Sequence, residues 1–524
     1  MNNQPLRTAQ FTRFACGCAL FLSAIFSAVF FFYGLFVTWY VHGNKEVLEI
    51  VDAVRLPAPL LLFATIGFLL LLSGILYSLW RLRPPHLLTA LLWVLWFFLS
   101  AAFLVANGLQ QVLDYQTVLE ASERLAAGSY SVLDQPYFHA LSHQIPMLLP
   151  MEIFARLFPR LPMNRAMQLL NLVTSLICGF CLSLIGGILF SKETRGAVRL
   201  LFFFSLPTVL YCTYVYGTIF MMVIDLTGTL FFLLYEQNKR NGQSTCRFLS
   251  ISAGVLIGLA CMMKYNGIIF VIAFMIISVL SALAKKNVCV LLPAVLSVVV
   301  CFGSTVGVIH LYECRAGIQM EDSISMKARF VMGLQEGPAS GWYNNYITQF
   351  ISREVTREEE LEKANADFQE RLQYFFEKPA YAISFFGEKL FSQWLDPTYG
   401  TIRYGQIAPR SCKYAMVSAL YDESSPWYRI IYGYMKLYQS SLYLLGALGL
   451  WFSMKNCNRD GTGIALLPVA FLGGMLYHLL FEAKSAYAWP YVVYLLPYAG
   501  YGLVSLLSFC VSWMKLKKSG NRGI

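Results

Sequence analysis

The chain has 524 residues, of which 57% are hydrophobic and 13% are charged, and its mean hydropathy is +0.56. Soluble domains carry about 25% charged residues, so this composition excludes an ordinary soluble protein and indicates an integral membrane protein. Forty Lys and Arg against 29 Asp and Glu give a formal net charge of +11. The basic residues stand in short loops beside apolar runs, which is typical of membrane topology rather than of nucleic-acid binding.

About twelve apolar runs approach or reach the ~20 residues that a helix needs to cross a bilayer. We expect spans at roughly 13–40, 58–80, 87–107, 166–190, 197–213, 216–236, 247–263, 266–284, 288–311, 430–454, 461–481 and 488–513. The first run is too long for the ~7–15 residue core of a signal peptide, so we expect it to be retained. The predicted fold class is an all-α polytopic membrane protein with about 12 transmembrane helices.

The charges of the loops predict which side of the membrane each loop occupies. With the amino terminus inside, every cytoplasmic loop and the tail are basic, as the positive-inside rule requires; they are 81–86, 191–195, 236–247, 284–287, 455–461 and the residues after 513. The protein is therefore expected in the cell membrane, with residues 108–165 and a long polar insertion outside. This predicts a transmembrane core (1–311), an extracytoplasmic loop domain (312–429) and C-terminal transmembrane helices (430–524).

The insertion contains a charged, helix-favouring stretch that runs from 352 to 390. Apolar residues return at helical spacing from Leu361 onward, which predicts one or two amphipathic helices on the outer leaflet or over a site. A solvated charged helix without a function is the other interpretation.

The 13 cysteines are scattered, mostly within apolar runs. Cys178 and Cys181 form a C-x-x-C pattern inside a membrane-length run, so we expect them to pack as small hydrophobic residues rather than to bind metal. No glycine-rich phosphate-binding loop is present in the sequence.

Asp114 lies just beyond the outer end of the third apolar run, in a stretch that also contains histidines, glutamine and tyrosines. A carboxylate at the membrane boundary can serve a catalytic function, although the boundary is a less costly place for it than the bilayer centre. The alternative is that Asp114 only caps a helix beginning at Tyr115.

The stretch 112–158 resembles the first outer loop of GT-C-fold membrane glycosyltransferases of the protein O-mannosyltransferase and aminoarabinose transferase type (glycosyltransferase family 39-like), in their bacterial branch. The matching residues are Asp114, Tyr115, Gln116, Ala121, Leu125, Gly128, Tyr130, Tyr137, Phe138 and Gln144. Further short motifs resemble the family in the same order, at 205–220, 258–273, 331–345 and 391–397. Ala486 stands where many relatives carry an arginine.

The resemblance implies a GT-C-like fold and an enzyme that transfers a sugar from a polyprenyl-phosphate donor to an extracytoplasmic acceptor: an envelope glycan, a lipid or a protein. Asp114 would be the general base, and Lys264 and Lys484 would bind the donor phosphate, Lys484 in place of the missing arginine. Sugar or acceptor would be bound by Tyr137, His143, Gln144, Tyr343, Trp394 and Asp396. A divalent cation bridging Asp114 and the phosphate is compatible with the sequence, which does not require one.

Two other classes of protein are compatible with these features of the sequence. A transporter or a flippase for lipid-linked glycans would also have many spans, but such proteins carry binding residues near the bilayer midplane and often contain repeats. Asp225 is the clearest midplane charge, and the two halves of the chain do not match. A structural or assembly protein without catalysis is the third class. The sequence identifies neither the sugar nor the acceptor.

Overall fold

The computed structural model describes residues 4–44, 46–82, 86–242, 246–320, 323–351, 355–412, 414–456 and 462–520. Within these ranges the chain is almost entirely helical, and eight helical segments are long and apolar enough to cross a membrane. Their main helices are α1 (Gln4–Phe36), α2 (Ala58–Leu82), α3 (His86–Asn107), α7 (Met163–Leu189), α10 (Thr218–Arg240), α12 (Ile268–Lys285), α13 (Leu292–Ala316) and α20 (Leu466–Leu480). The protein is thus a multi-pass, all-α membrane protein, as predicted.

A ninth span is formed if two consecutive helices cross together. Helices α21 (Ser485–Val493) and α22 (Leu496–Gly520) are bent by 55° at their junction. Together they cover the run expected at 488–513.

Three of the expected spans take other forms in the described chain. The run 247–263 forms α11 (Cys246–Met263), an apolar helix that is shorter than each of the eight spanning segments, because two of those segments also include a turn of 3-10 helix before α12 or α20. The run 430–454 lies in α19 (Pro426–Asn456), which is long enough but carries buried polar residues such as Lys436 and Gln439.

The run 197–213 is divided into α8 (Lys192–Phe203) and α9 (Leu206–Tyr211). Pro207 explains the break, because a proline lacks the N–H that would continue the helix to residue 203, whereas it is favoured in a first helical turn. The prediction of one span here was wrong, because Pro207 interrupts the apolar run.

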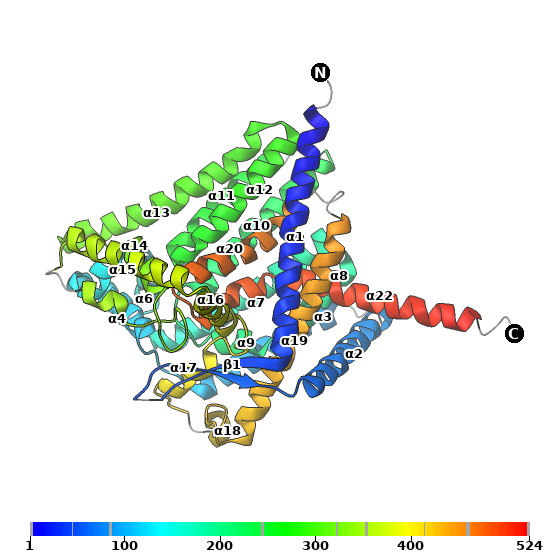
Figure 1. The fold of residues 1–524 in the computed structure, drawn as a ribbon, viewed down its shortest axis with the longest axis horizontal. Coiled ribbons are helices and arrows are strands. Elements are labelled where there is room, and N and C mark those ends of the chain that lie inside the picture. The colour runs from blue at the N-terminus through cyan, green and yellow to red at the C-terminus, as the bar shows by residue number, and fades with distance from the viewer. Residues whose placement is uncertain are drawn as a thin grey trace.

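The first span ends earlier than the expected residue 40. Strand β1 (Val37–His42) follows α1 directly and pairs antiparallel with β2 (Ile50–Arg55), with Val37 opposite Arg55. The sequence V-T-W-Y-V is rich in β-branched and aromatic residues, which favour a strand over a helix. This hairpin covers one end of the helical body (Figure 1).

Two sets of short helices lie outside the spanning bundle. The first follows α3 and comprises α4 (Asp114–Ala126), η1 (Tyr130–Asp134), α5 (Pro136–Ala140), η2 (Ser142–Gln144) and α6 (Ile145–Leu157). The second comprises α14 (Met326–Met332), η5 (Tyr346–Phe350), α15 (Arg357–Glu377), α16 (Pro379–Trp394), α17 (Thr401–Ile407) and α18 (Ala415–Ser418). The remaining turns of 3-10 helix are η3 (Tyr265–Gly267), η4 (Val288–Leu291) and η6 (Thr462–Ala465).

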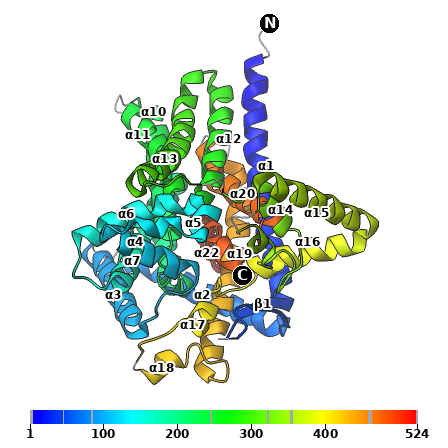
Figure 2. The same cartoon turned by 90° about the vertical axis from the view of Figure 1, so that its left-hand side faces the viewer.

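Helices α4, α6, α14 and α15 gather on one side of the body, whereas the two chain ends lie on other sides, at the top and right (Figure 1). After a quarter turn, α15 and α16 project from the body as a hairpin (Figure 2). Residues 83–85, 243–245, 457–461 and 521–524, which belong to predicted cytoplasmic loops and the tail, lie outside the described residues.

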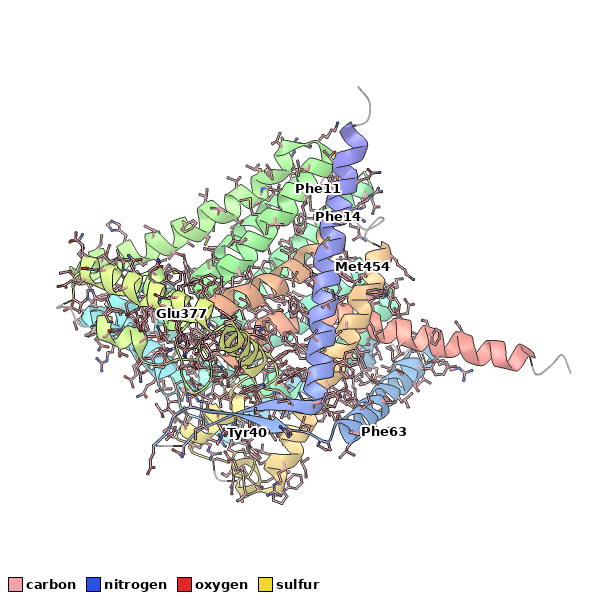
Figure 3. All side chains as sticks on the ribbon, in the orientation of Figure 1. Phe11, Phe14, Tyr40, Phe63, Glu377 and Met454 are labelled. Atoms are coloured by element: carbon pink, nitrogen blue, oxygen red, sulfur yellow. The ribbon has the colours of Figure 1, made fainter. Side chains whose placement is uncertain are left out.

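The surface of the spanning helices is apolar, as contact with lipid requires. Phe11 and Phe14 on α1 are 56% and 69% exposed, and Phe63 on α2 is 71% exposed (Figure 3). Inside the bundle, α1 packs along α19 and α19 packs on α22.

Candidate functional site

Asp114 is the first residue of α4, and the residue before it has an unusual backbone conformation. Leu113 occupies the N-cap position with φ of 56° and ψ of −140°, and no side chain caps the helix. A positive φ is costly for a bulky residue and is found most often where function fixes the backbone. The helix therefore begins at Asp114 and not at Tyr115, so the interpretation of Asp114 as an N-cap was wrong.

Asp114 belongs to a group of charged residues that act on one another electrostatically, and we use the name recess for Asp114, Lys264, Glu482, Lys484 and the tyrosines around them. Its side chain remains accessible to solvent. Burial in the recess raises the pKa of the Asp114 carboxyl, whereas the charges of Lys484 and then Lys264 lower it. These three charged groups come from three separate segments of the chain.

Lys264 joins α11 to η3 at the edge of the recess. Its Nζ donates to Thr218 Oγ1 at 3.0 Å and lies 4.5 Å and 5.2 Å from the ring centroids of Tyr216 and Tyr487. Burial lowers the pKa of Lys264 to about 7, with a further lowering from the charge of Lys484 and partial compensation by Asp114 and Glu482. Its ammonium is therefore a cation whose charge changes near neutral pH.

The hairpin between α9 and α10 provides the aromatic wall of the recess. Tyr115 stacks on Tyr214 with centroids 5.0 Å apart and meets Tyr216 edge-on at 5.1 Å. Buried amides hold the hairpin in place: Asn171 donates to the Tyr214 carbonyl at 2.6 Å, and Val215 N–H donates to Gln111 Oε1 at 3.1 Å. These hydrogen bonds fix the backbone of the hairpin on which Tyr214 and Tyr216 stand.

Gly217 ends this hairpin where it meets the segment of Lys264. A Cβ at residue 217 would stand 1.7 Å from the carbonyl oxygen of Met263, the residue that precedes Lys264. Glycine is therefore required for the two backbones to approach this closely.

Lys484 and Glu482 belong to the turn between α20 and α21. This turn is tied to the long outer segment, because Ala483 N–H donates to the Gly341 carbonyl at 2.8 Å. The tie places Tyr343 at the recess, where burial raises its pKa, as do the charges of Glu482 and Asp114, and Lys484 lowers it. Burial also raises the pKa of Glu482, partly offset by Lys484.

Ala486 lines a small cavity that also contacts Lys264 and Tyr487.

Tyr137, His143 and Gln144 lie on α5 and η2 at the margin of the recess. Gln144 Nε2 lies 3.3 Å from His143 Nε2, and Arg329 Nη1 lies 3.5 Å from the same atom. Burial, Arg329 and Lys264 lower the pKa of His143, so this imidazole is held neutral. The carboxyl of Asp114 and burial together raise the pKa of Tyr137.

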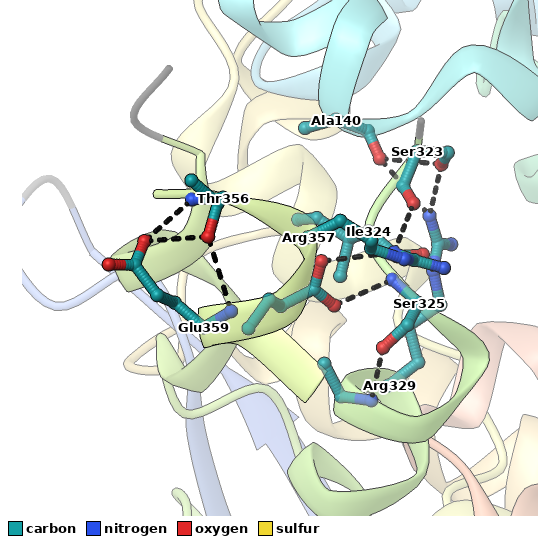
Figure 4. A network of polar contacts seen from close by, with 10 residues as sticks. Ala140, Ser323, Ile324, Ser325, Arg329, Thr356, Arg357 and Glu359 are labelled. Carbon is teal, nitrogen blue, oxygen red and sulfur yellow. Dashed lines mark hydrogen bonds and ion pairs between the residues drawn. The ribbon is translucent and has the colours of Figure 1, made fainter. Parts of the chain in front are cut away.

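A network of polar contacts fixes the outer segment to this margin (Figure 4). The Ala140 carbonyl at the end of α5 accepts from Ser323 Oγ at 2.8 Å and from Arg329 Nη2 at 3.3 Å. Arg357 Nη1 donates to the Ser323 carbonyl at 2.9 Å, and Glu360 accepts from Ser325 N–H at 2.8 Å. Helices α5, α14 and α15 are thereby held together.

Trp394 and Asp396 are not part of the recess. Both are fully buried: Trp394 stacks on Phe30 at 5.5 Å, and Asp396 accepts from Thr398 N–H at 2.9 Å and from Gly400 N–H at 2.8 Å. Neither offers a surface to a ligand in this structure, so the prediction that they bind sugar or acceptor does not fit. Asp396 instead stabilises the turn of residues 396–400, which precedes α17.

Sequence reasoning missed two contributors to the recess. Tyr216 carried a signal, since it lies in the motif 205–220, and Glu482 lies four residues before Ala486. Arg403, whose Nη1 lies 3.1 Å from Glu49 Oε1, joins the outer segment to the amino-terminal hairpin, and no local pattern indicates this pair. Among the described residues, no group of three or more His, Cys, Asp or Glu side chains is placed to hold a metal ion.

The chain is similar in structure to a solved protein, the archaeal oligosaccharyltransferase AglB from Archaeoglobus fulgidus in complex with an inhibitory peptide and a dolichol-phosphate. The alignment has a TM-score of 0.41 and 12% identity, and covers 82% of this chain and 52% of that chain. No protein-family model and no curated protein matches the sequence.

Proposed function

We propose that this protein is a membrane glycosyltransferase that takes a sugar from a polyprenyl-phosphate donor and gives it to an acceptor outside the cytoplasm. One observation carries the proposal: the accessible carboxylate of Asp114 shares a recess with two lysines from different segments, Lys264 and Lys484. A base beside cationic groups is what displacement of a phosphate from an anomeric carbon needs.

In the proposed reaction, the acceptor hydroxyl attacks the anomeric carbon. A bond forms from the acceptor oxygen to that carbon, and the bond from the carbon to the phosphate oxygen breaks with its electron pair. The hydroxyl proton passes to the Asp114 carboxylate, and polyprenyl phosphate leaves with one more negative charge than the donor had. Lys264 and Lys484 stabilise that charge as point cations.

Burial supports the role of Asp114 as the base. Because burial raises the pKa of its carboxyl, the group is a stronger base than an aspartate in water, and general-base catalysis works best when the pKa approaches the working pH. The position also fits, since a lipid-borne donor and a water-borne acceptor can meet only at the membrane boundary.

The transporter interpretation finds less support. Its best midplane group, Asp225 in α10, is fully buried and accepts a hydrogen bond from Tyr494 at 3.2 Å. A carboxylate held between helices in this way resembles a packing contact more than an open transport site.

Replacing Asp114 by Asn tests the proposal. We expect transfer of radiolabelled sugar from a polyprenyl-phosphate donor to fall by about 10²- to 10⁴-fold, because the amide keeps the shape and loses the base. Donor binding should persist. Glu123→Gln is the matched control, since Glu123 is an exposed carboxylate on the same helix. Normal transfer by Asp114→Asn in membranes containing the donor would refute the assignment.

A further inference from the structure

The outer segment contains a second cavity, separate from Asp114, with a volume of about 510 Å³. This volume lies within the ~300–1,000 Å³ typical of small-molecule sites. The cavity is open on one side, and we call it the outer groove.

One face of α15 forms one wall of the outer groove. Its residues follow helical spacing, so their side chains point to the same side; they are Lys363, Asp367, Glu370, Arg371 and Tyr374. The facing wall comes from the loop after α14 and from η5, through Gln335, Glu336, Asn344, Tyr346 and Gln349. In Figure 2 this part of the molecule stands out from the helical body.

Hydrogen bonds hold the frame of the groove before any ligand binds. Tyr346 OH donates to Asp367 Oδ2 at 2.6 Å, and Lys363 Nζ lies 3.1 Å from the same carboxylate. Arg371 Nε donates to the Leu334 carbonyl at 2.5 Å. Within the described chain the side chains of Gln335 and Glu370 form no hydrogen bond or ion pair, so their polar atoms remain available to a ligand.

The chemistry of the lining indicates the class of ligand. The groove is lined by amides, carboxylates, basic groups and tyrosines, with no aliphatic side chain among its ten residues. Amides and carboxylates bond neighbouring hydroxyls, and tyrosine rings supply flat apolar faces. A peptide groove would instead need apolar pockets or a free strand edge. Three acidic and two basic residues give no excess of cations for a polyanion.

The groove lies close along the chain to a segment that binds the recess. Asn344, which lines the groove, comes three residues after Gly341, whose carbonyl accepts from Ala483 N–H between Glu482 and Lys484. Asn344 Nδ2 donates to the Met332 carbonyl at 3.0 Å, which fixes this short connection. The groove and the recess are therefore connected by a short, hydrogen-bonded piece of chain.

We propose that the outer groove binds a neutral oligosaccharide, the acceptor of the transferase, with one end directed past Tyr343 to Asp114. The identification of this oligosaccharide as the acceptor rests on the proposed function. The binding of the oligosaccharide itself stands on the groove alone.

The test uses the full chain in lipid nanodiscs and a panel of immobilised neutral oligosaccharides, anionic oligosaccharides and a Ser/Thr-rich peptide. We expect a neutral oligosaccharide to bind. The double variant Gln335→Ala/Glu370→Ala should weaken this binding by at least about tenfold, since two hydrogen-bonding side chains that are available to a ligand are removed.

The matched control is Asn365→Ala/Gln369→Ala, which removes two exposed polar side chains from the opposite face of α15 and should leave binding within about twofold, the effect usual for a surface change. Failure of every neutral oligosaccharide to bind, binding that ignores the groove variant, or groove-dependent binding of the peptide instead would each overturn the inference. Asp114→Asn should still bind the oligosaccharide. Binding by that variant together with unchanged transfer would refute the base assignment and leave the groove intact.

Discussion

The pH dependence of donor binding tests the electrostatics of the recess. Lys264 has a pKa of about 7, so in the free protein its ammonium is charged below that pH and loses its proton above it. A polyprenyl-phosphate sugar is a phosphodiester and keeps one negative charge across this range. We therefore expect the affinity for such a donor to be highest at acidic pH and to fall as the pH rises through about 7.

The size of the fall follows from the charged fraction of Lys264. With a pKa of about 7, about half of the molecules carry the charge at pH 7 and about one tenth at pH 8. If the charged form binds much more tightly than the neutral form, the dissociation constant rises about fivefold between pH 7 and 8 and about tenfold for each further unit. Because the bound phosphate raises the pKa of Lys264, the affinity for the donor stops falling once the pH exceeds the pKa of Lys264 in the complex.

Neighbouring residues set the direction in which variants move this profile. The charge of Lys484 lowers the pKa of Lys264 and that of Asp114 raises it. Lys484→Met should therefore move the fall to higher pH, whatever its effect on affinity, and Asp114→Asn should move it to lower pH. Lys264→Arg should remove the dependence, since arginine stays charged to about pH 12 or above.

Equilibrium binding of a radiolabelled donor to the protein in nanodiscs, between pH 6 and 9, measures these profiles. A flat profile for the unaltered protein would refute the reasoning. An unchanged fall in Lys264→Arg would assign the titration to another group.

Two further predictions concern the packing around the recess. Gly217→Ala should weaken donor binding, because the new Cβ would stand 1.7 Å from the Met263 carbonyl and displace Lys264; Gly387→Ala in α16, where nothing lies within 4 Å, is the control. Arg403→Met should lower the free energy of unfolding by about 3–5 kcal/mol, because it leaves Glu49 buried and unpaired. The thermal unfolding midpoint should fall and recover largely in Arg403→Met/Glu49→Gln, and equal losses in both variants would contradict this explanation.

The sequence predicted the class of fold and much of the recess. Long apolar runs and basic loops report directly on membrane helices, because both follow from transfer of single side chains into lipid. Asp114, Lys264 and Lys484 were found through short motifs, and the structure brings all three together. Their chemical roles remain predictions.

Other features depend on contacts between distant segments and leave no local pattern. Trp394 resembles a binding aromatic in the sequence, but its neighbour in space is Phe30 of the first helix. Ser325 and Glu360, which help to fix α14 to α15, are 35 residues apart. Pro207 in the sequence indicates the break in the run 197–213, although the apolar composition of this run is typical of one continuous span.

The contacts of the amino-terminal hairpin bear on the order in which the chain assembles. Thr38 Oγ1 donates to the Leu395 carbonyl at 3.0 Å across 357 residues of sequence, and Trp39 N–H donates to the same carbonyl. During synthesis the hairpin emerges long before this partner, so Thr38 and Trp39, which are 1% and 6% exposed in the finished protein, stay uncovered until most spans have been inserted. Docking of the hairpin on the segment of Leu395 is therefore a late, non-local step, of the kind that slows folding and exposes a chain to misassembly.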